Sequence, residues 1–307
     1  MPKLKVLFVC SGNNPGGMSP NVRVQAEGLM KAGVDVTYFL IRGKGLRGYS
    51  SAAFTLRRFL RNEKYDVIHA HYGLSGIAAS MAGAGPLVVT IMGSELFLNR
   101  VLRSAVMFFI RNVWEKTIVQ SLEMKKAAGS DDVVVLPNGI DVDKFRTVDV
   151  KKAKEHTGFK TGKHIIWVSD PSRPEKNFAL AQKTAEVLGD GFELNAVYGK
   201  PHDDMPFYFK AADALLLTSK WEGSPIVVKE ALAAGLPVIS VDVGDVRKWL
   251  DGNEGCFVTE AKPEELADAL KKAVQFKGMM NAYDKVSDLE ISKVSERLKE
   301  IYLSVMK

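Results

Sequence analysis

The sequence is poor in cysteine and has no long apolar run. Its two cysteines, Cys10 and Cys256, lie at opposite ends of the chain without metal-like spacing, which favours two reduced, buried thiols. No apolar stretch approaches the roughly 20 residues that cross a bilayer. The apolar residues 6–10 are too short for a signal peptide and run directly into Ser-Gly-Asn-Asn. These absences predict a cytoplasmic protein.

The glycine pattern of a dinucleotide-binding loop is also missing. The loop at residues 11–17 follows an apolar strand-like segment, yet it lacks Gly-x-Gly-x-x-Gly spacing. This absence disfavours a two-domain nicotinamide-dependent dehydrogenase, an alternative that nicotinamide binding would restore.

Composition and charge are those of a globular chain with one basic half. The 307 residues are 46% hydrophobic and 25% charged, enough for one large or two modest α/β domains. Residues 1–145 hold 18 Lys and Arg against 11 Asp and Glu, while the rest of the chain is near neutral. A basic first half indicates an anionic partner: a membrane surface, a phosphorylated acceptor or nucleic acid.

Strand-like and helix-like segments alternate along the whole chain, which predicts parallel sheets covered on both faces. Expected strands occupy 4–10, 34–41, 67–70, 87–92, 117–120 and 133–136, then 163–169, 193–197, 214–218, 237–241 and 255–258. Expected helices occupy 21–32, 52–62, 76–82 and 98–114, then 151–157, 177–188, 206–212, 225–234, 263–274 and 285–306. The pattern restarts near residues 141–150. We expect domains at 1–145 and 146–287, with a helix at about 288–307 packing back on the first.

Ligands of such sheets bind beyond the carboxyl ends of the strands. At residues 221–238, Glu222 and Glu230 flank Gly223 and Ser224 at the start of an expected helix. A helix N-terminus attracts anions, and two nearby carboxylates are natural acceptors for vicinal hydroxyls. By spacing alone, Glu222 could equally cap the helix and Glu230 lie on the surface.

This segment resembles the Glu-x7-Glu motif of the family-4 retaining glycosyltransferases, which share the two-domain GT-B fold. Four further segments resemble family motifs in the same order, and together they cover nearly the whole chain. They are Asp-Val-Ile-His-Ala-His at 66–71, Pro-Asn-Gly-Ile-Asp at 137–141, Arg-Pro-Glu-Lys-Asn at 173–177, and Thr218-Ser219 through Gly244-Asp245-Val246. The resemblance implies two Rossmann-like, doubly wound domains facing across a cleft.

The resemblance implies a role for each matching donor-site residue. Glu230 would accept hydrogen bonds from the donor ribose hydroxyls. Glu222 would hold hydroxyls of the transferred sugar, near the N–H groups of Gly223, Ser224 and Ile226. Arg173 and Lys176 would neutralise the leaving diphosphate, since fixed cations aimed at developing charge lower the barrier. Glu222, Arg173 and Lys176 are thus the expected catalytic residues, and Gly17 belongs to a loop that would face the diphosphate.

The chain offers few residues for a metal. Its one Asp-x-Asp, Asp141-Val142-Asp143, lies in the expected linker, and the adjacent Asp203 and Asp204 read as solvated loop residues. We therefore expect no catalytic metal and no cofactor, with a UDP- or GDP-type sugar as substrate. His202, next to this pair, receives no role.

The resemblance departs from the family on the acceptor or sugar side, where His71, Met92 and Gly93 are the candidates. The family strand ends in His-Gly-Ser/Thr-Asp, whereas here Met92 replaces the histidine and Glu95 the aspartate. Methionine bonds sugar hydroxyls weakly, so either the sugar differs or the backbone supplies the contact. His69 and His71 could be one packed and one loop histidine instead. The arginine loop also departs from the common Gly-Arg spacing.

One clue concerns the acceptor. On a helix from about Leu98, Arg100, Arg103, Arg111 and Trp114 project onto one face, and Leu102, Val106, Phe109 and Val113 onto the opposite one. A basic stripe with Trp suits an anionic membrane surface, although a merely solvated face has the same pattern. No nucleic-acid motif accompanies the charge, so nucleic acid is not expected.

These observations lead to a metal-independent retaining transferase, peripheral on the inner membrane face, acting on a lipid-linked or polysaccharide acceptor. The alternative is a catalytically degenerate GT-B scaffold that binds sugar nucleotide or glycan without turnover. Turnover of donor in the presence of acceptor separates the two.

Overall fold

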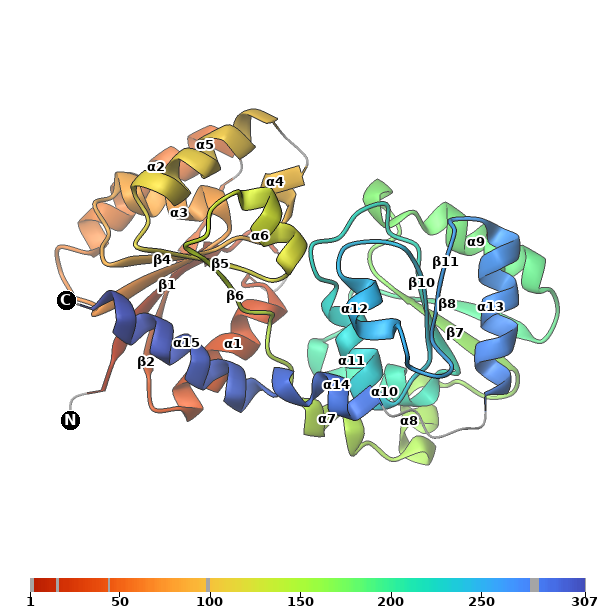
Figure 1. Cartoon of the computed structure of the whole chain (residues 1–307). Coiled ribbons are helices and arrows are strands. Elements are labelled where there is room, and N and C mark those ends of the chain that lie inside the picture. The colour runs from red at the N-terminus through yellow and green to blue at the C-terminus, as the bar shows by residue number, and fades with distance from the viewer. Residues whose placement is uncertain (1–2, 15–16, 44, 98–99, 277–281, 307) are drawn as a thin grey trace. The chain divides into compact units, whose positions relative to one another are not determined.

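The computed structural model describes residues 3–14, 17–43, 45–97, 100–276 and 282–306. The chain forms two compact units (Figure 1). Unit 1 comprises Met1–Gly139 and Ile291–Lys307, and unit 2 comprises Ile140–Glu290. The division falls inside the Pro-Asn-Gly-Ile-Asp segment, rather than after residue 145 as the change of pattern predicted.

The sheet of unit 1 is fully parallel, with strand order β2-β1-β3-β4-β5-β6. Its strands are β1 (Lys5–Ser11), β2 (Asp35–Ile41), β3 (Val67–His71), β4 (Leu87–Thr90), β5 (Lys116–Val119) and β6 (Val133–Val135). Alternate residues of β1 enter two different cores: Leu7 and Val9 one, Val6 and Phe8 the other. The sheet is therefore buried on both faces, as a parallel sheet requires.

Different helices cover the two faces of this sheet. One face packs against α2 (Gly45–Phe59), α3 (Gly73–Met81), α5 (Arg100–Asn112) and α6 (Leu122–Ala128), with the short α4 (Ser94–Phe97) beside α5. The other packs against α1 (Pro20–Lys31) and α15 (Ile291–Val305). Helices α1 and α15 approach closely at Gly28, where there is no room for a side chain. A Cβ at this position would lie 2.6 Å from Ile291 of α15.

Unit 2 has a five-stranded parallel sheet of order β11-β10-β9-β7-β8. The strands are β7 (Lys163–Val168), β8 (Phe192–Val197), β9 (Ala214–Leu217), β10 (Val238–Val241) and β11 (Phe257–Thr259). Its helices are α7 (Val142–Arg146), α8 (Val150–Thr157), α9 (Phe178–Leu188), α10 (Met205–Ala211), α11 (Ile226–Ala234), α12 (Val246–Leu250), α13 (Pro263–Gln275) and α14 (Ala282–Val286).

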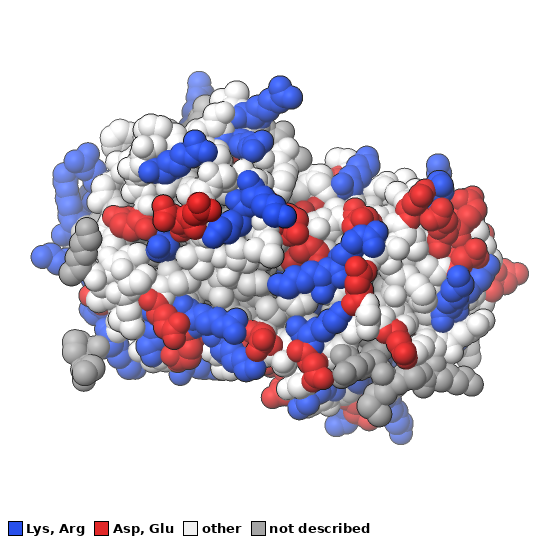
Figure 2. All heavy atoms as spheres, in the orientation of Figure 1, with Lys and Arg blue, Asp and Glu red and all other residues white. Residues whose placement is uncertain are grey.

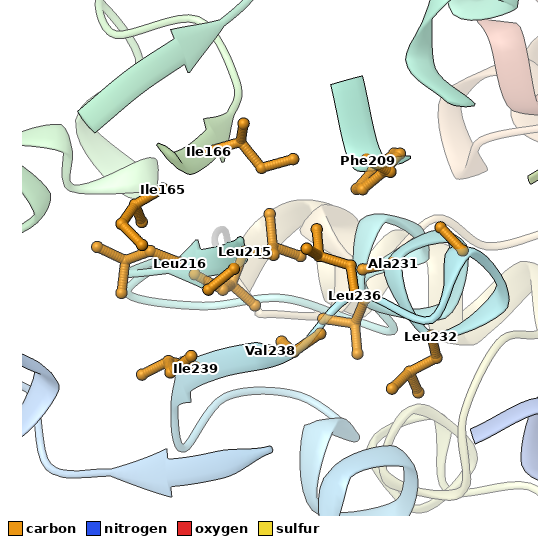
Figure 3. Packing of buried hydrophobic residues seen from close by; sticks show 14 of the residues in the cluster. Ile165, Ile166, Phe209, Leu215, Leu216, Ala231, Leu232, Leu236, Val238 and Ile239 are labelled. Carbon is orange, nitrogen blue, oxygen red and sulfur yellow. The ribbon is translucent and has the colours of Figure 1, made fainter. Parts of the chain in front are cut away.

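The helix after β9 is anchored in the core of unit 2. Ala231 and Leu232 of α11 are fully buried, and they belong to the same core cluster as residues of β7, β9 and β10 (Figure 3). Burying a leucine side chain contributes roughly 1.5–3 kcal/mol. Helix α11 is thus packed firmly into the core of unit 2.

The expected final helix is interrupted. Residues 285–306 form the end of α14, a 3-10 turn at Ser287–Leu289, and then α15. At the interruption, the N–H of Ile140 donates to the carbonyl of Leu289 at 2.8 Å. The Glu290 carboxylate also accepts from the N–H of Val142 at 3.0 Å. The two chain crossings between the units therefore run side by side within unit 2.

The predicted placement of Trp114 on an exposed basic stripe is wrong. Helix α5 ends at Asn112, so the helical projection does not extend to Trp114. The indole is buried, packs against Gly76 and donates from Nε1 to Ser80 Oγ at 3.0 Å. Val113, expected to face the core, is instead 41% exposed. Arg100, Arg103 and Arg111 are exposed as expected.

No helix within the described ranges is long and apolar enough to span a bilayer.

Candidate functional site

Three loops of unit 2 meet at one edge of its sheet. Strands β10, β9 and β7 are neighbours and parallel, so the loops after them lie together at their carboxyl ends. These loops are residues 169–177, 218–225 and 242–245. They contain most of the donor-site residues expected from the sequence.

The loops after β7 and β9 are joined through Thr218. Its hydroxyl donates to the carbonyl of Lys176 at 3.0 Å and accepts from Trp167 Nε1 at 2.9 Å. The N–H of Lys220 donates to the carbonyl of Glu175 at 2.8 Å. A buried indole and threonine thereby set the spacing between the basic loop and the acidic loop.

The central pair of this edge is Lys176 and Glu222. Lys176 Nζ lies 2.5 Å from Glu222 Oε1, and the side chains are 19% and 13% exposed. A charge-assisted contact at low exposure is held more firmly than a surface ion pair. The structure therefore brings together two of the three residues expected to be catalytic.

The third, Arg173, lies nearby but points to a different partner. Its guanidinium contacts Glu175 Oε1 at 2.6 Å, and the side chain is half-exposed. Pro174 starts a 3-10 turn that continues to Lys176, and Asn177 ends it in the left-handed conformation. Arg173 thus stands at the rim of the site with a side chain free of tight packing.

Helix α11 presents an uncapped N-terminus to the same edge. The residue before it, Pro225, provides no side-chain cap, and the first turn of a helix leaves N–H groups without internal partners. The helix is terminated by Gly235 in the left-handed conformation. Such a helix start fits an anion. Gly223 and Ser224, immediately before it, are buried, and Ile226 is half-buried.

Glu230 is buried and paired with a histidine. Its side chain is 6% exposed, and its Oε1 lies 2.8 Å from Nε2 of His202. The hydrogen bond to Glu230 raises the pKa of His202 above its ordinary value, against the effect of burial. His202 was not assigned in the sequence, because 28 residues separate it from Glu230 and no motif links the two. The observed contact adds it to the candidate site.

In unit 1, the residues expected on the acceptor or sugar side follow β3 and β4, which are neighbours. His71 closes β3 and is buried, and burial lowers its pKa to about 3, so the imidazole is neutral at pH 7. Met92 and Gly93 follow β4, and Gln120 Nε2 lies 3.6 Å from the Met92 sulfur.

The buried Glu95 carboxylate accepts hydrogen bonds from backbone N–H groups, including that of Met92. Its Oε1 accepts from the N–H of Met92 at 2.9 Å and from the N–H of Gly73 at 3.0 Å. The Met92 amide is therefore committed to Glu95. Burial raises the pKa of Glu95, and the two backbone donors act against that rise. The glutamate ties the turn after β4 to the start of α3.

His69 has a structural role. Its Nδ1 lies 2.7 Å from the Tyr302 hydroxyl of α15, and its Nε2 lies 2.7 Å from Thr90 Oγ1. The ring is fully buried, and burial lowers its pKa well below the ordinary value.

Gly17 follows β1 at the same edge of the unit 1 sheet. Its φ is +83°, a conformation that glycine adopts readily, and its N–H donates to the carbonyl of Asn14 at 2.8 Å. Pro15 and Gly16 of the expected glycine-rich loop lie outside the described residues.

Each unit therefore has polar loops beyond the carboxyl ends of a parallel sheet, which is where the ligands of such sheets bind. Residues 15–144 match the family model described as Glycosyltransferase Family 4, and residues 175–287 match that described as Glycosyl transferases group 1. Together the two models match most of the chain, which belongs to this glycosyltransferase family, as the sequence motifs predicted.

Its relatives include two curated bacterial proteins. One is the putative teichuronic acid biosynthesis glycosyltransferase TuaC of Bacillus subtilis, 28% identical over 252 residues, covering 72% of this chain and 64% of that protein. The other is the UDP-Gal:alpha-D-GlcNAc-diphosphoundecaprenol alpha-1,3-galactosyltransferase of Escherichia coli, 25% identical over 309 residues, covering 82% and 79%. The chain thus spans just under two thirds of the Bacillus protein.

A solved structure confirms the GT-B fold. The Anabaena protein Alr3699/HepE in complex with UDP and glucose superposes with a TM-score of 0.75 at 17% identity, covering 99% of this chain and all of that chain.

Proposed function

We propose that this protein transfers a sugar from a nucleotide-diphosphate donor to a glycan or lipid-linked acceptor, with retention and without a metal. The observation that carries the proposal is the half-buried Lys176–Glu222 pair beside the uncapped start of α11. It combines a cation, a carboxylate and free backbone N–H groups, which are the groups that a sugar diphosphate needs.

The roles follow from the chemistry of the departing group. Breaking the glycosidic C–O bond places negative charge on the diphosphate, which Lys176, Arg173 and the start of α11 would stabilise. Glu222 would orient hydroxyls of the sugar. The acceptor hydroxyl would attack on the face that the diphosphate leaves, and the diphosphate would take its proton.

Protein cations would supply the charge stabilisation that a divalent metal gives elsewhere. In the described part of the chain, no group of three His, Cys, Asp or Glu side chains is arranged to hold a metal ion. Asp143 pairs with Arg146 and Asp203 contacts Lys144, so these carboxylates are engaged in surface ion pairs. The proposal of a metal-independent mechanism rests on the cations Lys176 and Arg173.

The relatives support a choice of donor and acceptor. The Anabaena structure contains UDP and glucose, and the name of the Escherichia coli relative specifies a UDP-sugar and a diphosphoundecaprenol-linked acceptor. We infer a UDP-sugar as donor, with a GDP-sugar as the second candidate, and a lipid-linked or polysaccharide acceptor.

The catalytically degenerate scaffold is the second candidate, and Met92 favours it. The side chain lacks a strong hydrogen-bonding group, and its backbone N–H is already bonded to Glu95. Such a protein would bind the donor without turning it over.

A nucleotide panel with a turnover assay tests both candidates. We expect one nucleoside diphosphate, and its sugar, to raise the melting temperature, because ligands of the folded state stabilise it. Release of that nucleotide from its sugar, in the presence of lipid-linked or oligosaccharide acceptors, identifies the transferase. Stabilisation without turnover supports the scaffold. No stabilisation by any nucleotide contradicts the transferase and favours a scaffold that binds glycan alone.

We further propose that the side of unit 1 formed by α2 and α5 contacts an anionic membrane on its cytoplasmic face. Its exposed basic residues are Arg47, Arg57, Arg58, Arg100, Arg103 and Arg111, and Figure 2 shows Lys and Arg gathered there. Arg103 and Arg111 also donate to carbonyls at the end of α6. Three apolar side chains project among these arginines: Phe54 (76% exposed), Val101 (81%) and Phe108 (59%). Basic and aromatic groups together suit a lipid headgroup region.

Replacing Phe54 and Phe108 by serine is expected to weaken binding to vesicles containing phosphatidylglycerol by at least about 100-fold, because insertion of each ring contributes about 1.5–3 kcal/mol. Cosedimentation measures the effect, and Leu303→Ser, which changes an exposed residue of α15, is the matched control. Added salt should weaken binding of the wild type. Equal binding by the double variant contradicts the proposal.

A further inference from the structure

Lys229 is a buried cation in an unfavourable place. Its side chain is 1% exposed, and it lies in the fourth position of α11, near the positive end of the helix dipole. Burying an ammonium group costs free energy unless partners compensate it. A cation retained here indicates a use beyond stability.

The contacts of Lys229 lead directly to the loop that carries Glu222. Its Nζ donates to Ser224 Oγ and lies 5.0 Å from the centre of the Trp249 ring. The Ser224 hydroxyl in turn donates to Asp245 Oδ2 at 2.7 Å. Because the Ser224 hydroxyl donates its single proton to Asp245, the serine side chain links the Glu222 loop to the turn after β10.

The turn after β10 supports the same loop from the other side. Gly244 has φ +55°, and a Cβ there would lie 2.9 Å from the carbonyl oxygen of Glu222 and 3.2 Å from that of Gly223. Asp245 follows directly and is buried, with its Oδ1 lacking a hydrogen-bond partner among the described residues. The Glu222 loop is therefore held on one side by the turn after β10 and on the other by Lys229 of α11.

We propose that Lys229, Ser224 and Asp245 form a buried positioning cluster that fixes the Glu222 loop and adds the Lys229 charge behind the anion-binding start of α11. The inference rests on the proposed function, because the anion it serves is the donor diphosphate. Lys229 acts by holding the Glu222 loop in place and through the electrostatic field of its charge. It makes no contact of its own with the donor in this proposal.

The cluster makes nucleotide binding sensitive to pH. Burial lowers the pKa of Lys229 to about 8, Asp245 and Glu230 favour the charged form, and the neighbouring Lys248 opposes it. The charged form, which attracts the diphosphate, is present below this value and is lost as pH rises through it. A bound diphosphate favours the charge, so affinity should fall as pH rises above about 8.

The test compares Lys229→Met with Lys248→Met by calorimetric titration of UDP between pH 7 and pH 9.5. Lys248→Met is the control for the loss of one positive charge, because Lys248 lies over the same Trp249 ring, 4.7 Å from its centre, and is exposed. Phosphate groups with a second pKa of about 6 are ionised throughout this range. The His202–Glu230 pair is unchanged in both variants, so its titration cancels in the comparison.

We expect the wild type to lose UDP affinity about tenfold across this range. Lys248→Met should keep this dependence but shift it to higher pH, because Lys248 lowers the pKa of Lys229. Lys229→Met should bind about tenfold more weakly at pH 7, with a much flatter profile. Because this variant leaves Asp245 buried without its compensating charge, Lys229→Met with Asp245→Asn serves as a second variant. It should fold more stably yet keep the flat profile.

Two results would overturn the inference. A Lys229 variant with a lowered melting temperature but the wild-type pH profile of UDP affinity shows a packing role only, while the proposed function stands. Failure of the folded wild type to bind any nucleoside diphosphate overturns the proposed function and this inference together.

Discussion

Replacing Glu230 by glutamine is expected to weaken nucleoside-diphosphate binding about 100-fold. Hydrogen bonds to a charged group contribute about 1.5–3 kcal/mol each, and a carboxylate can accept from both ribose hydroxyls. Glu230 is buried in α11, so its position is fixed by the core rather than by the ligand. Glutamine keeps the shape of the side chain while removing its charge and one acceptor oxygen.

Calorimetric titration of UDP measures the Glu230→Gln effect, and Glu186→Gln, an exposed change on α9, is the control. The ribose contact can be isolated with 2′-deoxy-UDP. The wild type should lose affinity for the deoxy compound, whereas Glu230→Gln should discriminate little between the two ligands. An unchanged preference for the ribonucleotide in the variant would place the ribose elsewhere.

Replacing Lys176 by methionine is expected to lower kcat about 10²–10³-fold, the usual cost of removing one preorganised group that stabilises transition-state charge. The charge on the diphosphate grows as the bond breaks, so kcat should fall more than donor affinity. Loss of Lys176 also leaves Glu222 without its ion-pair partner. Release of nucleotide from the donor, measured in single turnover, reports the chemical step.

Lys183→Met, a change at an exposed position of α9, controls for the loss of one positive charge. Arg173→Met should have a smaller effect than Lys176→Met, because Arg173 is half-exposed and paired with Glu175. A normal kcat in Lys176→Met, with the donor still bound, would remove Lys176 from the reaction.

The alternation of strands and helices was readable from the sequence because each element has its own hydrophobic period. Some short helices were missed. Helices α6 and α12, of seven and five residues, were not expected, whereas α10, also of seven residues, was expected at 206–212. Trp114 was misplaced because a helical projection assigns faces only while the helix lasts, and α5 ends two residues before it.

The site was predictable where its residues lie in segments that resemble family motifs, and less so where residues outside those motifs meet through the fold. Lys176 and Glu222 were both expected at the donor site because each lies in such a segment. The contact between His202 and Glu230 depends on how the loop after β8 approaches α11, which leaves no local trace in the sequence. Lys229 reads as an ordinary helix lysine, and only its burial reveals the contact with Ser224.

Helix α15 has a consequence for the order in which the protein is made. It supplies Val294, Leu298 and Tyr302 to the core beneath α1, yet it is synthesised after all of unit 2. A ribosome therefore completes the inserted unit while one face of the first sheet is covered by α1 alone and still lacks α15. Domains tend to fold as units during synthesis. Unit 1, whose synthesis begins first, therefore completes its fold after unit 2.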